Sequence, residues 1–326
     1  MNPFKFLKAK SSKEAVAAMS DHTNAKFIGG GTNIIDLMKM NIEKPEYLID
    51  ITALDLKGIE TLPNGNVRIG ALVKNSDLAY NNIIKIRYPL LSDALLSGAS
   101  PQLRNMATTG GNLLQRTRCP YFYDKVTPCN KREPGSGCSA IEGYNRKHAI
   151  LGISDHCIAT HPSDMCVAMA ALDAIINAES PNGKRSINFE DFHLLPGNTP
   201  DKENSLLNDE LITSVEIPPL PFASNSTYIK VRDRSSYEFA LTSAAIALEL
   251  NGDVISDARI ALGGVGTKPW RAKDAEQSLK GKKASLETYR AAADIALKDA
   301  MTFKYNAFKT ELAKRTIIAA FQNLEK

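Results

Sequence analysis

The residues of this chain that could do the most specific chemistry are its five cysteines, which all fall in one short window. They are Cys119, Cys129, Cys138, Cys157 and Cys166, and the other residues of the 326-residue chain include none. Such clustering is typical of thiols that act together, as metal ligands or as a disulfide framework. The odd count weakens the disulfide hypothesis, although an oxidising compartment would permit it. Idle buried thiols that lie together by chance are the third possibility.

Among metals, the spacing of the first four cysteines favours an iron–sulfur cluster over zinc. Zinc sites usually contain paired Cys-x2-Cys knuckles, and this sequence has no such pair. The intervening segments are 9, 8 and 18 residues long. Long, irregular spacings suit four thiolates gathered around a bulky 4Fe–4S core by a loop.

The cysteines lie in a segment, residues 116–166, that has no clear helical or strand period. A loop of this length is uncommon in a compact domain unless something orders it, and a bound cluster would supply the ordering free energy. Basic residues flank the first two cysteines and could compensate the negative charge of a cluster, or could equally form a solvated basic face. They are Arg116, Arg118, Lys131 and Arg132.

Two glycine-rich turns are candidates for nucleotide binding. Residues 29–33 (GGGTN) follow an apolar strand and open a helix, and residues 108–112 (TTGGN) form a second turn of similar type. Backbone N–H groups of glycines can converge on an anion, and a helix N-terminus adds a partial positive charge. Neither turn is a GxGxxG or Walker motif, so a purely structural turn explains each one alone equally well. Together they could hold the two ends of a dinucleotide pyrophosphate.

Further polar candidates follow these turns. Asp164 could accept hydrogen bonds from ribityl or ribose hydroxyls, or could cap the helix that begins there. Lys230 and Arg232 lie on an expected strand, where one could face a flavin or a phosphate, although exposed strand charges are commoner. His156 and His161 could be ligands, but solvated loop histidines are more usual.

The elements that must position these residues indicate an α+β protein. Strands are expected near residues 25–28, 47–51, 67–73, 211–217, 228–231, 240–250 and 257–262, and helices near 34–38, 88–96 and beyond 272. A composition of 43% hydrophobic and 23% charged residues excludes disordered and fibrous classes. The net charge of +4, with dispersed basic residues, argues against a nucleic-acid partner. We also expect no membrane span and no ordinary secretory signal.

Four segments, in order along the chain, resemble the FAD-binding medium subunits of the xanthine dehydrogenase and carbon monoxide dehydrogenase family. They are KFIGGGTNIIDLM, SGASPQLRNMATTGGNLLQ, HPSDM and ALGGVGTKPWR, and the resemblance spans essentially the whole chain. The segment RTRCPYFYDKVTPCNKREPGSGC, with Cys157 after it, is more specific. It resembles the flavin subunits of bacterial periplasmic aldehyde oxidoreductases, molybdenum enzymes in which this subunit carries an additional 4Fe–4S cluster.

The resemblance implies a two-subdomain FAD-binding fold of the vanillyl-alcohol-oxidase (PCMH) type over residues 1–221, with subdomains at about 1–54 and 55–221. A smaller α/β domain would follow at 222–326. The implied FAD-binding residues are Lys26, Phe27, Ile28, Gly29, Gly30, Gly31, Thr32, Asn33, Ile34, Thr108, Gly111, Asn112, Asp164 and Lys230. The implied cluster ligands are Cys119, Cys129, Cys138 and Cys157, which leaves Cys166 as a small buried residue at the start of a helix.

The resemblance also implies a role as the electron-transfer flavoprotein subunit of a heterotrimeric, molybdenum-dependent aldehyde oxidoreductase. A molybdopterin-binding large subunit would oxidise the aldehyde, and a 2Fe–2S small subunit would pass electrons to this FAD and on to an external acceptor. No residue of this chain is then expected to be a catalytic acid or base. The compartment would be the periplasm, by co-export with a signal-bearing partner, or otherwise the cytoplasm. The alternative is a non-enzymatic, metal- or cluster-stabilised binding module without flavin.

Overall fold

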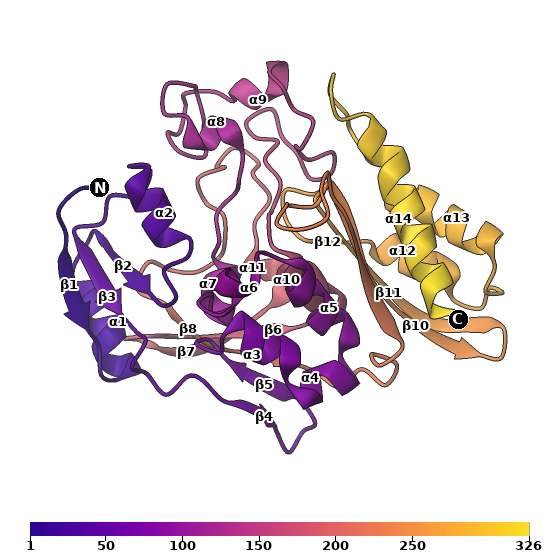
Figure 1. The fold of residues 1–326 in the computed structure, drawn as a ribbon, viewed down its shortest axis with the longest axis horizontal. Helices are drawn as coiled ribbons and strands as arrows, with labels where there is room; N and C mark the ends of the chain where they lie inside the picture. The colour runs from indigo at the N-terminus through magenta and orange to yellow at the C-terminus, as the bar shows by residue number, and fades with distance from the viewer. Residues whose placement is uncertain (326) are drawn as a thin grey trace.

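The computed structural model describes residues 1–325 and contains three β-sheets with helices between and outside them (Figure 1). The strands are β1 (Lys5–Lys8), β2 (Ala25–Ile28), β3 (Tyr47–Asp50), β4 (Ile59–Thr61), β5 (Val67–Gly70), β6 (Ile175–Ser180), β7 (Gly183–Asn188), β8 (Leu211–Ile217), β9 (Ser226–Val231), β10 (Thr242–Asn251), β11 (Val254–Gly263) and β12 (Trp270–Arg271). The helices are α1 (Ser12–Asp21), α2 (Ile34–Lys39), α3 (Asn75–Tyr80), α4 (Asn82–Arg87), α5 (Pro89–Ser97), α6 (Pro101–Arg104), α7 (Thr109–Leu113), α8 (Pro120–Tyr123), α9 (Ser139–Glu142), α10 (Asp164–Ala171), α11 (Phe189–Phe192), α12 (Lys273–Leu279), α13 (Leu286–Ala296) and α14 (Phe308–Leu324).

The N-terminal unit is a parallel sheet in the order β1-β3-β2 with α1 and α2 beside it. Helix α1 begins where a side chain can satisfy a free backbone N–H, because Ser11 Oγ accepts from the Glu14 N–H at 3.1 Å. Strand β2 ends at Ile28, and the three glycines that follow turn the chain into α2. The first glycine-rich turn therefore lies directly after a strand of this unit and before α2.

The central unit is a five-stranded antiparallel sheet in the order β4-β5-β8-β6-β7. Its core joins β5, β6 and β8 to α3, α4, α5 and α10. All eight residues of α10 are buried, because the helix lies between this unit and the C-terminal sheet. Small alanine side chains let the helix pack closely on both sides.

The C-terminal unit is an antiparallel sheet in the order β12-β11-β10-β9, with a hairpin turn at Gly252-Asp253. Helices α12, α13 and α14 cover one face of this sheet, where Tyr289 and Phe321 stack with ring centroids 4.5 Å apart. The α+β class is confirmed by this arrangement. The boundaries near residues 54 and 221 stay predictions.

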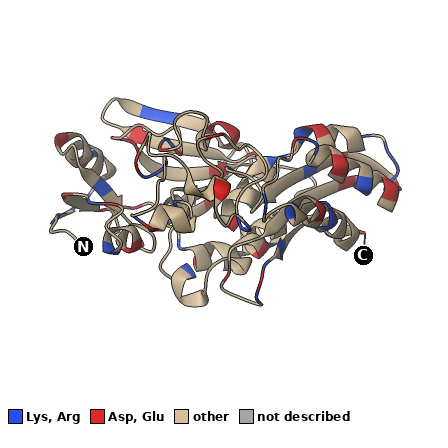
Figure 2. Cartoon of the chain, turned by 90° about the horizontal axis from the view of Figure 1, so that it is seen from above, with Lys and Arg blue, Asp and Glu red and all other residues tan. Residues whose placement is uncertain are grey.

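The segment that carries the cysteines is mostly irregular, with the short helices α8 and α9, and lies at the top of Figure 1. It docks on the turn after β11, because the N–H groups of Ile150 and His161 donate to the carbonyls of Val265 and Gly266. Basic and acidic residues are interspersed over the chain seen from above in Figure 2. None of the helices within residues 1–325 is both long and apolar enough to cross a bilayer.

Candidate cofactor site

The two glycine-rich turns meet in space. A Cβ at Gly30 would lie 2.0 Å from the carbonyl oxygen of Met106, and one at Gly29 would lie 3.2 Å from Thr108 Oγ1. Gly31 has a φ of +74°, which favours glycine. The chain thus brings together the first two groups of expected FAD-binding residues. A side chain at position 30 would push the two turns apart.

Side-chain hydrogen bonds extend this contact to a third segment. Thr108 Oγ1 accepts from the Gly111 N–H at 3.2 Å and caps α7. Asn112 Oδ1 accepts from Ser163 Oγ at 2.6 Å, which ties the second turn to the start of α10. Asn33 Oδ1 accepts from the Arg116 N–H at 3.0 Å, while its buried Nδ2 finds no acceptor in the described part of the chain. A buried donor of this kind is satisfied when a ligand with acceptor oxygens binds.

Asp164 and Lys230 form a buried ion pair. Lys230 Nζ lies 2.8 Å from Asp164 Oδ2, and the two side chains are 3% and 9% exposed. Tyr228 donates its hydroxyl proton to Asp164 Oδ1 at 2.6 Å, and burial together with the carboxylate raises the pKa of Tyr228 well above its usual value. Ser163, and not Asp164, caps α10 by accepting from the Cys166 N–H at 3.0 Å. Tyr228 was not among the expected site residues. Its spacing of two from Lys230 on one strand places both side chains on the same face of the sheet, which could have indicated it.

A cavity of about 350 Å³ opens beside this ion pair. Asp164 and Ser163 line one part of it, and Phe239 and Gly263 line another. Its size and its mixture of apolar and polar walls suit part of a cofactor such as a flavin ring system.

The other expected FAD-binding residues lie on β2, in the first turn and at the start of α2. Lys26 is half exposed and lies 3.9 Å from Glu43. Phe27 and Ile28 are partly buried on β2, and Thr32 and Ile34 stand in the turn and at the start of α2.

The four expected cluster cysteines line one small cavity. Cys129 and Cys138 pair through an antiparallel backbone bridge, which brings two distant stretches of the loop together. Asn130 Nδ2 donates to the His156 carbonyl at 3.0 Å and ties this bridge to the segment before Cys157. All five cysteines are free thiols, which contradicts the disulfide hypothesis. Cys166 is fully buried in the first turn of α10, as expected of a small core residue.

Two of these thiols are poor acids in the absence of a cation. Burial, together with the neighbouring thiols, raises the pKa of Cys119 to about 12 and that of Cys157 to about 11. Backbone N–H groups of Phe122 and Tyr121 oppose the shift at Cys119, and Lys131 opposes it at Cys157. The thiolates of Cys119 and Cys157 therefore need nearby positive charge, such as that of a bound metal, to form.

Two of the four flanking basic residues, Arg116 and Lys131, pair with acids, which corrects the expectation of a solvated basic face for these two. Arg116 pairs with Glu43 and Glu203, each at 2.7 Å. Lys131 pairs with Glu203 at 2.9 Å. Arg132 donates to the carbonyls of Tyr121 and Phe122 at 2.7 and 2.8 Å. Arg116, Lys131 and Arg132 hold the loop in place, and of them only Lys131 also acts on a cysteine.

Cys119 connects the two cavities, because it lies in the wall of each. Leu37 of α2 packs with Phe122 and Cys129, so the helix after the first glycine turn also supports the cysteine loop. The flavin and cluster candidates are thus neighbouring parts of one region.

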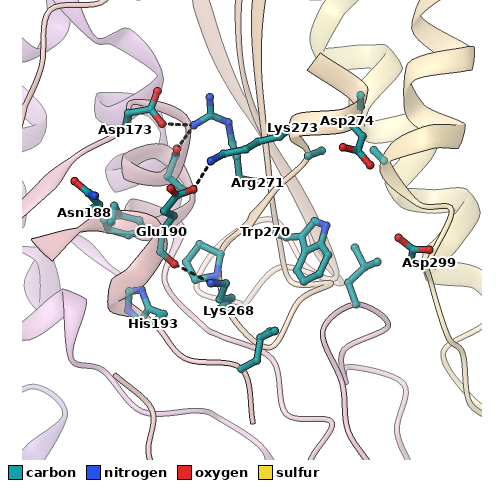
Figure 3. A pocket seen from close by; sticks show the side chains of 18 of the residues that line it. Asp173, Asn188, Glu190, His193, Lys268, Trp270, Arg271, Lys273, Asp274 and Asp299 are labelled. Atoms are coloured by element: carbon teal, nitrogen blue, oxygen red, sulfur yellow. Dashed lines mark hydrogen bonds and ion pairs between the residues drawn. The ribbon is translucent and has the colours of Figure 1, made fainter. Parts of the chain in front are cut away.

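Two further findings concern a separate cavity and two histidines of the cysteine loop. A cavity of about 520 Å³, drawn in Figure 3, lies between α11 and α12, where Arg271 pairs with Asp173 at 2.7 Å. It is lined by none of the expected cofactor residues within the described chain. His161 was expected to be solvated, but its Nε2 is buried and its ring lies 4.4 Å from that of His193. His156 is exposed, as expected.

Two family models match this chain. Residues 2–220 match the FAD binding domain in molybdopterin dehydrogenase, and residues 227–324 match the CO dehydrogenase flavoprotein C-terminal domain. The first match favours a flavoprotein over the alternative of a binding module without flavin.

Curated relatives extend over nearly the whole chain. The aldehyde oxidoreductase FAD-binding subunit PaoB of Escherichia coli is 50% identical over 97% of this chain and 96% of its own length. The glyceraldehyde dehydrogenase medium chain of Sulfolobus acidocaldarius is 30% identical over 90% of this chain and 86% of its own.

Solved structures agree in fold. A carbon monoxide dehydrogenase from Hydrogenophaga pseudoflava, lacking the Mo-pyranopterin moiety of its molybdenum cofactor, matches with a TM-score of 0.76. The identity is 26%, and the match covers 98% of this chain and 96% of that one.

Proposed function

Because this chain belongs to the FAD-binding medium subunits of the molybdenum hydroxylase family, in its aldehyde oxidoreductase branch, we propose that it carries electrons from a partner subunit through FAD to an external acceptor. Bound FAD supplies the ability to take up electrons singly and release them in pairs. The task of the protein is to bind, orient and electrostatically tune the cofactor.

Different residues would contact different parts of the FAD. The backbone N–H groups of residues 29–33 would hold the pyrophosphate, at the point where this turn meets the second one. The free Nδ2 of Asn33 would donate to an acceptor oxygen of the cofactor. Asp164 would accept from a ribityl hydroxyl, and Lys230, held by Asp164 and the Ser97 carbonyl, would supply positive charge near the ring system.

We further propose that Cys119, Cys129, Cys138 and Cys157 bind a 4Fe–4S cluster. The supporting observation is that these four thiols, and not Cys166, line a single cavity. Because Cys119 also borders the larger cavity beside Asp164, such a cluster would be a close neighbour of the flavin.

The proposed assembly is a heterotrimer with a molybdopterin-binding large subunit and a 2Fe–2S small subunit. The relatives support it, since several are named medium chains or medium subunits of dehydrogenases and hydroxylases. A periplasmic location, reached by co-export with a signal-bearing partner, is proposed on the resemblance of the cysteine segment alone.

The test is the cofactor content of the purified complex. Cys129→Ser should remove about four iron atoms per chain, while the matched variant Cys166→Ser should keep them. Both variants should keep FAD. A fully assembled complex without FAD would refute the flavoprotein role, and an unchanged iron content in Cys129→Ser would refute the cluster assignment.

A further inference from the structure

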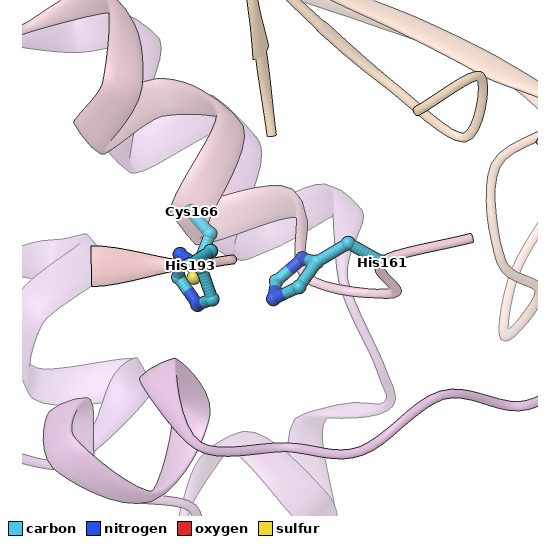
Figure 4. Close-up of side chains that lie close together, drawn as sticks. All are labelled: His161, Cys166 and His193. Carbon is cyan, nitrogen blue, oxygen red and sulfur yellow. The ribbon is translucent and has the colours of Figure 1, made fainter. Parts of the chain in front are cut away.

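Three donor side chains from separate elements meet beneath the start of α10. His161 comes from the end of the cysteine loop, Cys166 from the first turn of α10, and His193 directly follows α11. One donor atom from each lies within 4.8 Å of the other two, and Figure 4 shows the His161 ring turned toward the other two side chains. The expected functions of the chain use none of these residues.

The ring nitrogens in this cluster are incompletely satisfied. His193, only 5% exposed, donates its Nε2 proton to the Leu113 carbonyl at 3.0 Å, which leaves a lone pair on Nδ1. Neither that Nδ1 nor Nε2 of His161 has a hydrogen-bond partner among residues 1–325, although both atoms are buried. A histidine that donates one ring N–H to a backbone carbonyl and keeps the other nitrogen free is oriented as metal-binding histidines are.

We propose that His161, Cys166 and His193 bind one divalent transition-metal ion, for which Zn²⁺ is the best match. Two imidazoles and a thiolate are ligands that zinc prefers, and three protein ligands leave a fourth tetrahedral position. A cavity of about 30 Å³ beside both histidines, which Glu203 and Thr160 also line, offers room for a water molecule there.

Binding has a defined proton balance. The metal takes the sulfur electron pair, and the Cys166 thiol releases one proton to solvent. The Ser163 N–H lies 3.3 Å from Nδ1 of His161. Without metal, Nδ1 is therefore the acceptor and Nε2 carries the ring proton. When Nε2 binds the metal this proton moves to Nδ1, which becomes a donor, so the contact with Ser163 must lengthen.

The site would act as a structural cross-link below the flavin region. His161 and Cys166 flank Ser163 and Asp164, which face the proposed flavin, and His193 anchors them to the central unit. This site is separate from the cysteine cavity, which Cys166 does not line.

The test is the zinc content of the whole complex purified after growth with added Zn²⁺ and then desalted. Wild type should hold about one more zinc per chain than His193→Gln or Cys166→Ala. His156→Gln, an exposed histidine of the same loop, is the matched control and should retain wild-type zinc. Equal zinc in wild type and His193→Gln would overturn the proposal.

Iron and FAD contents of the same preparations separate this proposal from the previous one. His193→Gln should lose zinc while keeping iron, so that failure of the cluster or flavin assignments would not affect the result. If His193→Gln does not assemble, Cys166→Ser provides the second variant, and its zinc must also fall. Zinc retained in that variant would contradict Cys166 as a ligand.

Discussion

The Sγ atom of Cys119 lies 3.1 Å from Nε2 of His148, at the point where the cysteine cavity adjoins the larger one. A thiolate bound to iron carries no proton, so in the proposed cluster the imidazole must be the donor. Burial and the nearby Lys309 lower the pKa of His148 to about 4, which keeps the ring neutral. His148 therefore directs a neutral N–H donor at a proposed cluster ligand.

The first prediction concerns the reduction potential of the cluster. Hydrogen bonds to ligand sulfur atoms favour the reduced state. His148→Phe should therefore lower the potential, on the order of tens of millivolts for one lost hydrogen bond. A redox titration followed by electron paramagnetic resonance measures this, with His22→Phe as the control, because His22 lines neither cavity. An unchanged potential in His148→Phe would show that the ring does not tune the cluster.

The second prediction concerns the meeting of the two glycine turns. Gly30→Ala should sharply reduce FAD content, because its Cβ would lie 2.0 Å from the Met106 carbonyl oxygen and would force the turns apart. Gly58→Ala is the matched control, since a Cβ at Gly58 meets no atom of the described chain within 4 Å. Flavin released from equal amounts of protein is the measurement. Equal FAD in the two variants would be the contrary result.

The third prediction separates a buried ion pair from an exposed one. Asp164→Ala leaves Lys230 buried without its carboxylate, which should cost about 3–5 kcal/mol of stability and release FAD. Asp233→Ala removes a partly exposed partner of Arg146 and should cost about 1 kcal/mol or less. Unfolding temperature and flavin content of both complexes provide the comparison. Similar losses in both would contradict a special role for Asp164.

The fourth prediction concerns pH. Burial lowers the pKa of Lys309 to about 7, and its Nζ donates to the His148 carbonyl at 2.8 Å. Between pH 7 and 10.5 the unfolded chain keeps this proton while the folded chain releases it, so the contribution of Lys309 to stability rises with pH. From this group, the free energy of unfolding rises by at most about 1.4 kcal/mol per pH unit.

Lys309→Met removes this titration. Unfolding of wild-type and variant complexes should be followed from pH 7 to pH 9, over which wild type should gain stability relative to the variant. Parallel curves would mean that Lys309 stays protonated when folded.

Local patterns in the sequence were sufficient for much of the fold. The strands expected near residues 25–28, 47–51 and 211–217 depend on neighbouring residues, and the structure has them as β2, β3 and β8. The choice of four cysteines as a group, without Cys166, came from the family resemblance of their segment, and the cavity that they share agrees with it.

Contacts between distant segments could not be predicted from local sequence patterns. Arg116 meets Glu203 across 87 residues, so its neutralisation could not be inferred from the basic residues around it. His161 is covered because its segment docks on Gly266, and His193 reaches it from the end of a short helix. Such pairings depend on how the three sheets pack, which no single stretch of sequence specifies.

Residues 145–150 of the cysteine loop, between Cys138 and Cys157, are held by residues 301–309. Tyr305 N–H donates to Asn145 Oδ1 at 3.0 Å, Lys309 donates to the carbonyl of His148, and Met301 N–H donates to that of Ile150. During synthesis these partners leave the ribosome more than 100 residues after Cys157. Residues 145–150 therefore acquire these partners only after residue 309 has been synthesised, so the loop that holds the proposed cluster ligands would be fixed in place late in folding.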